Sequence, residues 1–483
     1  MSKSTRRTKI WNPKLLRRPA LLCAALVVSI VGASARDVAQ FFSTSCANCH
    51  GPDLRGASAK SLINGVWNHG SDDDSIARVI REGDALKGMP AWKGVLTEAE
   101  IRAMVVLLHE KLAQAQSQTN IVAKPIDGEI VTSAEHKFQF QTVVDNLDTP
   151  WSIAFLPDGR MLVTELPGRL RIVEQGRLLT NAVAGIPRVR AQGQGGLLDV
   201  AVHPGYRTNG WIYLSYSDGA VLEGKEVGMT AVVRGRIKDN QWTDEQTIFR
   251  AAPDTYLPTT HHYGSRLVLD GQGYVYFTIG ERGYMQMAQD ITKPNGKVHR
   301  LYEDGRVPAD NPFVGQSNAV PSIWSYGHRN PQGLTQNPRT GEIWETEHGP
   351  RGGDELNLIR PGRNYGWPLI TYGMDYNGSP IEGALTAKEG LEQPIVHWTP
   401  SIAVCGMDFY FGTKFPRWQG DLFVTALAQQ ELRRIVLDGQ RVVKQEVLFK
   451  NIGRVRAVRS GPDGLLYVAL NGPNKIIRLE PVP

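Results

Sequence analysis

Two cysteines and a histidine near the N-terminus have the spacing that attaches a haem. The segment Cys46-Ala47-Asn48-Cys49-His50 is a C-x-x-C-H sequence. At this spacing two thiols bond to the two vinyl groups of one haem, and the histidine that follows is held under the iron. The sequence therefore predicts a haem c, with Cys46 and Cys49 as covalent anchors and His50 as an iron ligand.

A second set of chemically capable residues lies much further along the chain. An imidazole beside a carboxylate is the arrangement that orients a general base and raises its basicity. Arginines bind carboxylates through paired hydrogen bonds, and backbone carbonyls hold a hard cation such as Ca²⁺. Each residue alone is typical of a solvated strand end, so only their convergence would make a site. The set comprises His262, Glu281, Arg329, Asn330, Gly349, Pro350, Arg454 and Arg456.

The first 35 residues have the composition of an export signal. They contain seven Lys and Arg and no acid, an apolar run over residues 21–31, and the small-residue cleavage site Ala33-Ser34-Ala35. The apolar run is too short to span a membrane comfortably. We expect a signal peptide cleaved near Ala35 and a periplasmic protein without a stable membrane span. An uncleaved membrane anchor is the alternative.

Removal of this signal changes the charge of the chain. The whole chain carries a formal charge of +6, whereas residues 36–483 hold 47 basic and 48 acidic residues. A nucleic-acid partner is therefore not expected. Cys23 leaves with the signal and two cysteines belong to haem, so no internal disulfide is possible. We expect Cys405 to be a small buried residue at the start of a strand.

The composition and the periodicity of apolar residues divide the chain into a small helical domain and a long β-rich domain. Residues 36–112 are predicted to be helical, and the last helix has a capping box at Thr97 and Glu100. Ile101, Met104, Val105, Leu108 and Leu112 follow this box at helical spacing. Residues 113–137 are polar and lack either periodicity, which is typical of a linker. Residues 138–483 form the β-rich domain.

The β-rich domain repeats one pattern six times: an apolar strand, a turn and a second apolar strand. Six copies in about 345 residues leave 50–60 residues for each, which suits the four-stranded blades of a six-bladed propeller. A β-sandwich is the alternative fold. The strand pairs predicted are 152–156 with 161–164, 197–204 with 211–214, 266–269 with 274–277, 332–334 with 342–344, 407–410 with 421–424, and 455–458 with 465–468.

Hairpin geometry indicates which of the candidate residues meet. Residues equally distant from an antiparallel turn lie opposite each other, give or take a bulge. The turn at residues 270–273 pairs His262 with Glu281. The turn near Arg339 places residues 329–330 beside 349–350, and the turn at 462–464 places Arg454 and Arg456 opposite residues 470–472. In a propeller these strand ends open on one face around the axis, where they suit a polyanionic ligand.

These motifs resemble the soluble quinoprotein glucose/sorbosone dehydrogenase family, six-bladed propellers that bind pyrroloquinoline quinone (PQQ) with Ca²⁺. The resemblance covers residues 140–480. It rests on Gln194-Gly195-Gly196-Leu197-Leu198, His262-Tyr263-Gly264-Ser265-Arg266-Leu267, Gly327-His328-Arg329-Asn330-Pro331-Gln332-Gly333-Leu334, Glu347-His348-Gly349-Pro350 with Gly353-Asp354-Glu355, Asn364-Tyr365-Gly366-Trp367-Pro368, and Trp398-Thr399-Pro400-Ser401.

The resemblance implies a role for each matching residue. His262 would take the proton of the anomeric hydroxyl with Glu281 as its acidic partner, and Arg329 would stabilise the quinone oxygen as hydride arrives. Gly349 and Pro350 would offer carbonyls to Ca²⁺. The residues implied at the quinone are Gln194, Asn330, Trp398, Arg454 and Arg456.

The chain departs from the family pattern at two positions. Ala428 stands where relatives carry a cofactor-binding lysine, and Ala457 follows the second arginine where an acidic residue is common. Both departures concern the affinity for the quinone rather than the class of reaction.

Residues 36–112 resemble a class I c-type cytochrome. The resemblance implies His50 as the proximal iron ligand and Met89, in Gly88-Met89-Pro90, as the distal one. Methionine ligation raises the reduction potential, which suits an electron acceptor. His69 and His109 are weaker candidates for the iron.

Together these features predict a periplasmic quinohaemoprotein oxidoreductase. It would oxidise an aldose-type sugar to a lactone by hydride transfer to PQQ, and pass the electrons to its own haem c and on to a cytochrome, a quinone or an oxidase of the respiratory chain. Two alternatives remain. One is a Ca²⁺-dependent propeller hydrolase of the lactonase type, and the other is an electron-transfer or binding protein whose propeller has lost PQQ.

Overall fold

The computed structural model describes residues 36–64, 67–119 and 127–483. The predicted signal peptide, with Cys23, lies outside these residues. All the described residues belong to one compact unit, Ala35–Pro483. Within them, no helix combines the length and the apolar character that crossing a membrane requires.

The N-terminal part is helical, as the sequence predicts. Asp72 caps α3 by accepting a hydrogen bond from Ser75 N at 2.9 Å. The capping box before α4 is present, because Thr97 N donates to Glu100 Oε2 at 2.8 Å and Glu100 N donates to Thr97 Oγ1 at 3.2 Å. The elements are α1 (Val38–Phe41), the π-helix η1 (Phe42–Cys46), α2 (Ala47–His50), α3 (Asp73–Glu82), the 3₁₀ turn η2 (Ala85–Lys87) and α4 (Glu98–Thr119).

Regular structure continues into part of residues 113–137. α4 runs on to Thr119, through a stretch rich in Ala and Gln, which are good helix formers. A short strand, β1 (Ile130–Thr132), pairs with β2 (Lys137–Val144). The boundaries of the linker stay a prediction.

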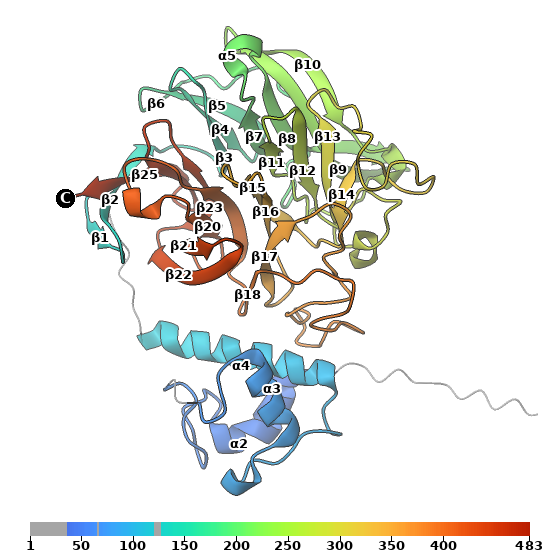
Figure 1. Cartoon of the computed structure of the whole chain (residues 1–483), viewed down its shortest axis with the longest axis vertical. Coiled ribbons are helices and arrows are strands. Elements are labelled where there is room, and N and C mark those ends of the chain that lie inside the picture. The colour runs from blue at the N-terminus through green and yellow to red at the C-terminus, as the bar shows by residue number, and fades with distance from the viewer. Residues whose placement is uncertain (1–35, 65–66, 120–126) are drawn as a thin grey trace, which may run out of the picture. The chain divides into compact units, whose positions relative to one another are not determined.

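The remainder forms six antiparallel sheets arranged around one axis (Figure 1). Blade 1 holds β3 (Pro150–Phe155), β4 (Met161–Glu165), β5 (Arg169–Glu174) and β6 (Arg177–Leu178). Blade 2 holds β7 (Leu197–Val202), β8 (Ile212–Leu222), β9 (Lys225–Lys238) and β10 (Gln241–Phe249), with α5 (Tyr206–Asn209) in its first turn. Blade 3 holds β11 (Leu267–Leu269), β12 (Tyr274–Ile279), β13 (Lys297–Tyr302) and β14 (Ile323–Tyr326).

Three further blades complete the ring. Blade 4 holds β15 (Pro331–Gln336), β16 (Ile343–Glu347), β17 (Asp354–Ile359) and β18 (Val396–Trp398). Blade 5 holds β19 (Val404–Phe409), β20 (Leu422–Ala426), β21 (Glu431–Asp438) and β22 (Arg441–Phe449). Blade 6 holds β23 (Arg454–Ser460), β24 (Leu466–Asn471) and β25 (Lys475–Val482) together with β2 and β1. The 3₁₀ turns η3 (Pro253–Thr255), η4 (Met285–Ala288) and η5 (Pro416–Trp418) lie in connections.

The six-bladed propeller predicted from the repeats is confirmed. Each predicted strand pair corresponds to the first two strands of one blade. The inner strands β3, β7, β11, β15, β19 and β23 contact one another in a closed ring, which a two-layer sandwich does not form. The chain closes this ring by pairing β2 with β25, in the register Phe138↔Pro481. A strand from each end of the domain thus joins one sheet, and no long sheet edge is left between the first and last blades.

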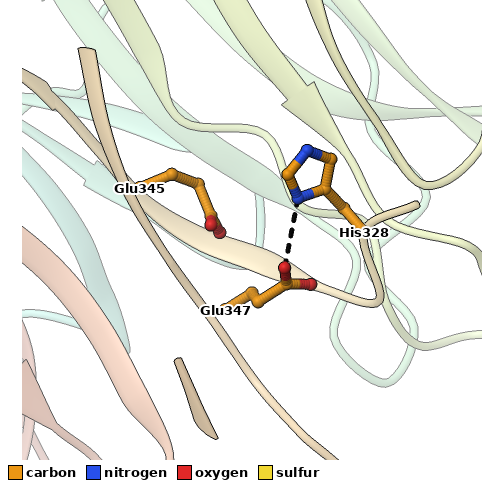
Figure 2. Close-up of side chains that lie close together, drawn as sticks. All are labelled: His328, Glu345 and Glu347. Atoms are coloured by element: carbon orange, nitrogen blue, oxygen red, sulfur yellow. Dashed lines mark hydrogen bonds and ion pairs between the residues drawn. The ribbon is translucent and has the colours of Figure 1, made fainter. Parts of the chain in front are cut away.

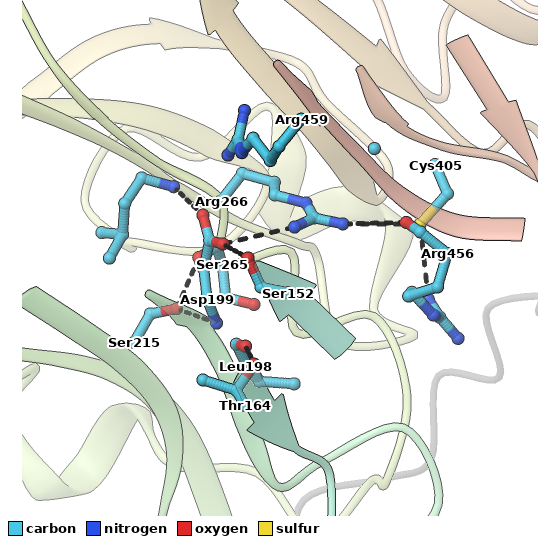
Figure 3. A network of polar contacts seen from close by, with 12 residues as sticks. Ser152, Thr164, Leu198, Asp199, Ser215, Ser265, Arg266, Cys405, Arg456 and Arg459 are labelled. Atoms are coloured by element: carbon cyan, nitrogen blue, oxygen red, sulfur yellow. Dashed lines mark hydrogen bonds and ion pairs between the residues drawn. The ribbon is translucent and has the colours of Figure 1, made fainter. Parts of the chain in front are cut away.

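An ion pair buried at the axis links the inner strands (Figure 3). Arg266 Nη1 lies 3.2 Å from Asp199 Oδ1, and both side chains are almost fully buried. The Asp199 carboxylate also accepts hydrogen bonds from Ser152 Oγ and from Leu267 N. The Arg266 guanidinium donates to the carbonyls of Gln332 at 2.9 Å and Arg456 at 3.0 Å. Its Nη2 also donates to Cys405 Sγ on blade 5 at 3.9 Å, so these bonds connect residues on all six blades.

Removal of the Asp199 carboxylate should destabilise the propeller strongly. Asp199→Ala leaves the Arg266 guanidinium buried without its counter-charge, which costs about 3–5 kcal/mol of unfolding free energy. Asp158→Ala is the matched control, because Asp158 pairs with Arg160 on the surface and such pairs contribute about 1 kcal/mol or less. Urea unfolding followed by tryptophan fluorescence measures both. Equal losses in the two variants would contradict the role given to Asp199.

Candidate active site

His262 and Glu281 lie side by side at the open end of the first hairpin of blade 3. His262 precedes β11, and Glu281 follows β12. His262 Nδ1 is 3.0 Å from Glu281 Oε1, and both side chains are buried. The β11–β12 ladder runs in the register Leu267↔Phe277, one residue away from the register predicted. The side chains meet nevertheless, because both residues lie outside the paired part of the ladder, where its register no longer applies. His262 has a φ of 55°, which is rare for a residue other than glycine, and Gln194 Oε1 holds its amide by accepting a hydrogen bond at 2.8 Å.

The surroundings of this pair favour a neutral imidazole. Burial lowers the pKa of His262, as does the nearby Arg329, while the hydrogen bond to Glu281 partly opposes the shift. Burial would raise the pKa of Glu281, but His262 and Arg329 outweigh it and the pKa is lowered. An ionised Glu281 therefore accepts the Nδ1 proton of His262, which leaves Nε2 with a free lone pair. This is the protonation state of a general base.

Arg329 and Asn330 extend the group onto blade 4. Arg329 Nη1 donates to the carbonyls of Gly349 at 2.6 Å and His348 at 3.2 Å. Asn330, fully buried, accepts from Gly264 N at 3.3 Å. The structure thus brings residues 329–330 and 349–350 together. The Gly349 carbonyl already accepts a hydrogen bond from Arg329, so a cation would have to use its other lone pair.

The neighbour of Gly349, His348, was not predicted. Its side chain is half-buried, and its buried Nε2 has no hydrogen-bond partner among the described residues. Burial and the charges of Arg329 and Arg456 lower its pKa to about 3. His348 also lines a cavity of ≈ 10 Å³ together with Arg329, Gly349, Glu355 and Trp367. A neutral imidazole with an unpaired nitrogen beside the site is a further group that a ligand can bond. Its burial beside two arginines is a tertiary property that the sequence does not show.

The two arginines of blade 6 lie where the hairpin geometry places them. Arg454 is opposite Asn471 in the β23–β24 ladder, and Arg456 Nε donates to Asn471 Oδ1 at 3.3 Å. Arg456 Nη1 also contacts Gln332 Oε1 at 3.2 Å and Cys405 Sγ at 3.4 Å. Cys405 is fully buried. Within the described ranges neither arginine forms an ion pair with a carboxylate.

Trp398 packs between the outer strands of two blades. It lies on β18, the outermost strand of blade 4, and its indole N–H donates to Gln445 Oε1 at 2.9 Å. Its ring belongs to a hydrophobic cluster with Ile402 and Phe409. The aromatic residue that contacts Arg329 is Trp367, whose ring centre lies 5.3 Å from the guanidinium carbon. A role for Trp398 at the quinone stays a prediction.

A buried acidic cluster lies on blade 4 and at the residue before Arg329 (Figure 2). His328, Glu345 and Glu347 bring ligand atoms within 4.8 Å of one another, which is close enough for one metal ion. Asn357 Nδ2 donates to Glu345, Glu347 and Glu355 at 3.1–3.2 Å. Burial and the charge of Glu347 raise the pKa values of Glu345 and Glu355. The signal for this cluster was the acidic residue at every second position of the strand 345–347, which puts both on one face.

The haem-attachment sequence lies on a surface of the helical part. Cys46 and Met89 pack partly buried against the same hydrophobic cluster, which includes Phe42 and Leu54. Burial and the neighbouring Cys49 raise the pKa of Cys46 to about 11. Burial lowers the pKa of His50, so its imidazole is neutral, the form that ligates iron. These residues fit a haem. They offer two thiols, a neutral imidazole and a thioether beside an apolar cluster.

The two weaker iron candidates are engaged elsewhere. His69 Nε2 lies 2.8 Å from Asp84 Oδ2, and His109 Nε2 lies 2.7 Å from Asp73 Oδ1. A histidine paired through Nε2 with a carboxylate does not present that nitrogen to a metal. Met89 therefore remains the predicted distal ligand.

The propeller group fits an anionic cofactor by its donor set. Among the described residues, Arg454 and Arg456 form no ion pair with a carboxylate. Arg329 Nε is a buried donor that also has no partner there. Such unpaired donors are costly unless a ligand satisfies them. Ala428 is exposed just beyond the end of β20 and contributes no charge there.

Comparisons with known proteins agree with both parts of the structure. Residues 147–478 match the family described as glucose/sorbosone dehydrogenase, and residues 33–108 match the family of the cbb3-type cytochrome c oxidase subunit III. The aldose sugar dehydrogenase YliI of Escherichia coli is 44% identical over 349 residues, which cover 71% of this chain and 92% of the relative.

The names of two further relatives mention a quinone cofactor. Quinoprotein glucose dehydrogenase B of Acinetobacter calcoaceticus is 32% identical, with 68% of this chain and 85% of the relative covered. The PQQ-bound structure of an aldose sugar dehydrogenase from Streptomyces coelicolor is 26% identical, with a TM-score of 0.59 over 74% of this chain and all of that one. The chain belongs to the glucose/sorbosone dehydrogenase family, and it carries a cytochrome c domain in front of the propeller.

Proposed function

We propose that this protein is a periplasmic, PQQ-dependent aldose dehydrogenase that uses its own haem c as electron acceptor. The substrate is an aldose-type sugar, oxidised at the anomeric carbon to a lactone. The observation that carries the proposal is the buried His262–Glu281 pair at 3.0 Å with Arg329 close by. Arg454 and Arg456, which form no ion pair with a carboxylate in the described part of the chain, support it. The names of the relatives support the same reaction and the same cofactor.

The residues that would hold each cofactor follow from the donor set. Gln194, Asn330, Arg329, Arg454 and Arg456 offer donors and charge to the carboxylates and carbonyl oxygens of PQQ. The carbonyls of Gly349 and Pro350 are the ligands proposed for Ca²⁺. When bound, PQQ accepts the hydride of the sugar, and haem c on Cys46, Cys49, His50 and Met89 accepts electrons one at a time.

The chain itself moves the proton of the reaction. Glu281 accepts the Nδ1–H of His262 and so fixes the imidazole tautomer, with Nε2 ready to take the hydroxyl proton of the sugar. The charge of the resulting imidazolium is stabilised by the Glu281 carboxylate. Arg329 lies close enough to lower the pKa of His262, and its positive charge is placed to stabilise negative charge that develops on the oxidant.

His262→Ala should abolish sugar-dependent haem reduction and leave the haem spectrum unchanged. The mature protein is supplied with PQQ and Ca²⁺, and haem absorbance is followed as a panel of aldoses is added. Loss of a general base costs about 10²–10⁴-fold in rate. His203→Ala is the matched control, because His203, directly after β7, pairs at 2.8 Å with Glu303, directly after β13, and neither is a candidate site residue. Full activity of His262→Ala, or lactone hydrolysis without haem reduction in the wild type, would contradict the proposal.

The rate should depend on pH through the imidazole of His262. Because the pKa of His262 is lowered below its usual value of 6.5, kcat/KM should rise with pH below 6.5 and be level at pH 7. Glu281→Gln removes the carboxylate that raises this pKa, so the rise should move to lower pH while the level rate falls about tenfold or more. A pH–rate profile of each variant measures both effects. An unchanged midpoint in Glu281→Gln would separate Glu281 from the base.

A further inference from the structure

The middle of α4 is too apolar to have only one buried face. Val105, Val106, Leu107 and Leu108 are four consecutive residues, and all are buried. Successive residues point about 100° apart around a helix, so four in a row cover its whole circumference. One side packs on α3, through Ile76 and Ile80. The other side needs a second partner.

That second partner is the segment of the propeller that follows Gly349 and Pro350. Met374, fully buried, belongs to the same hydrophobic cluster as the residues of α4. Met374 and Arg351 exchange two backbone hydrogen bonds at 2.9 Å. A side chain at Gly352 would meet Val106 Cγ1 at 3.1 Å, so backbone and helix are in close contact there. Arg102 also donates to the carbonyl of Ala384.

An ion pair with two hydrogen bonds aligns the contact. Arg351 Nε and Nη2 donate to the two carboxylate oxygens of Glu110 at 2.8 and 2.6 Å. The side chains are 31% and 23% exposed, so water screens the pair only partly. Two parallel hydrogen bonds fix the orientation of both groups as well as their distance.

The same turn of α4 also contacts the segment that directly follows the haem-attachment sequence. Lys111, next to Glu110, donates through Nζ to the carbonyl of Pro52 at 2.8 Å, and Pro52 is two residues beyond His50. On the other side, Arg351 is two residues beyond Gly349, so their Cα atoms are at most about 7.6 Å apart. One helical turn therefore connects a residue beside the predicted iron ligand to a residue beside the predicted Ca²⁺ ligand.

We propose that α4 docks on the propeller segment of Arg351, Gly352 and Met374, and that electrons leave the propeller for the haem across this contact. The inference rests on the proposed function. Oxidation of one aldose to a lactone releases two electrons and two protons, and a haem iron takes one electron, from Fe(III) to Fe(II). Each sugar therefore requires two transfers across the contact. A one-electron oxidant, such as an oxidised cytochrome, must restore Fe(III) after each.

Charge reversal tests the contact. Glu110→Arg places two cations together and should disrupt docking, and Arg351→Glu should do the same with two anions. The double variant restores an opposite-charge pair. Glu98→Arg is the matched control on the same helix, since Glu98 pairs with Arg81 inside the helical part and is 58% exposed. Hydrogen exchange of residues 101–111, without sugar, should be faster in both single variants and slow again in the double variant.

Electron transfer gives the second readout. With PQQ, Ca²⁺ and an aldose, Glu110→Arg should slow haem reduction about tenfold or more in stopped flow, because like charges in contact cost several kcal/mol. Sugar-dependent reduction of a dye that takes electrons directly from the propeller should stay unchanged, and the double variant should recover haem reduction. Unchanged haem reduction in both single variants, or equal losses for haem and dye in Glu110→Arg, would overturn the proposal.

The two readouts separate this inference from the function on which it rests. If the wild type reduces neither haem nor dye with any sugar, the proposed function fails, and with it the electron route. Hydrogen exchange then still decides whether α4 docks through Glu110 and Arg351. Unaltered exchange in both single variants would refute the docking contact by itself.

Discussion

The buried Arg266–Asp199 pair is the interaction on which the rest of the propeller depends. A ring of six sheets has little apolar volume at its centre, because inner strands converge there with their backbones. Hydrogen bonds take over that role, and the two charged groups bond to residues from all six blades (Figure 3). Burial lowers the pKa of Arg266, and the Asp199 carboxylate opposes that shift. A charge pair in such a place is tolerated only because almost every donor and acceptor is satisfied.

The candidate active site is built on that axis. Arg266 donates to the carbonyl of Arg456, and residues 262–265 immediately precede Arg266 in the chain. The positions of the candidate base on blade 3 and of a candidate quinone-binding arginine on blade 6 are therefore set by one guanidinium. Arg329 lies close enough to His262 to lower its pKa. The buried carboxylate of Glu347 in turn holds the backbone of Arg329, since its Oε2 accepts the Arg329 amide at 2.5 Å.

Local pattern was enough for much of this architecture. Strand periodicity and turn residues located the first two strands of every blade, and the capping box located the start of α4. The His262–Glu281 contact could also be predicted, although the ladder register differs by one residue, because both side chains lie past the end of the ladder. The resemblance implies Trp398 at the quinone, and that role stays a prediction. Its packing on Ile402 and Phe409 depends on the neighbouring blade, which a local pattern does not show.

The sequence by itself determined the haem-attachment pentad, the sixfold repeat and the hairpins that carry the candidate residues, because each depends on residues close together in the chain. Only the tertiary structure decided which hairpins converge, because ring closure joins residues that are far apart in the chain, as Asn471 and Pro150 are. It also decided that His348 holds a buried Nε2 without a partner among the described residues, and that α4 has a second buried face. Burial and contact between distant segments leave no periodic signal in the chain, so no local pattern could have shown them.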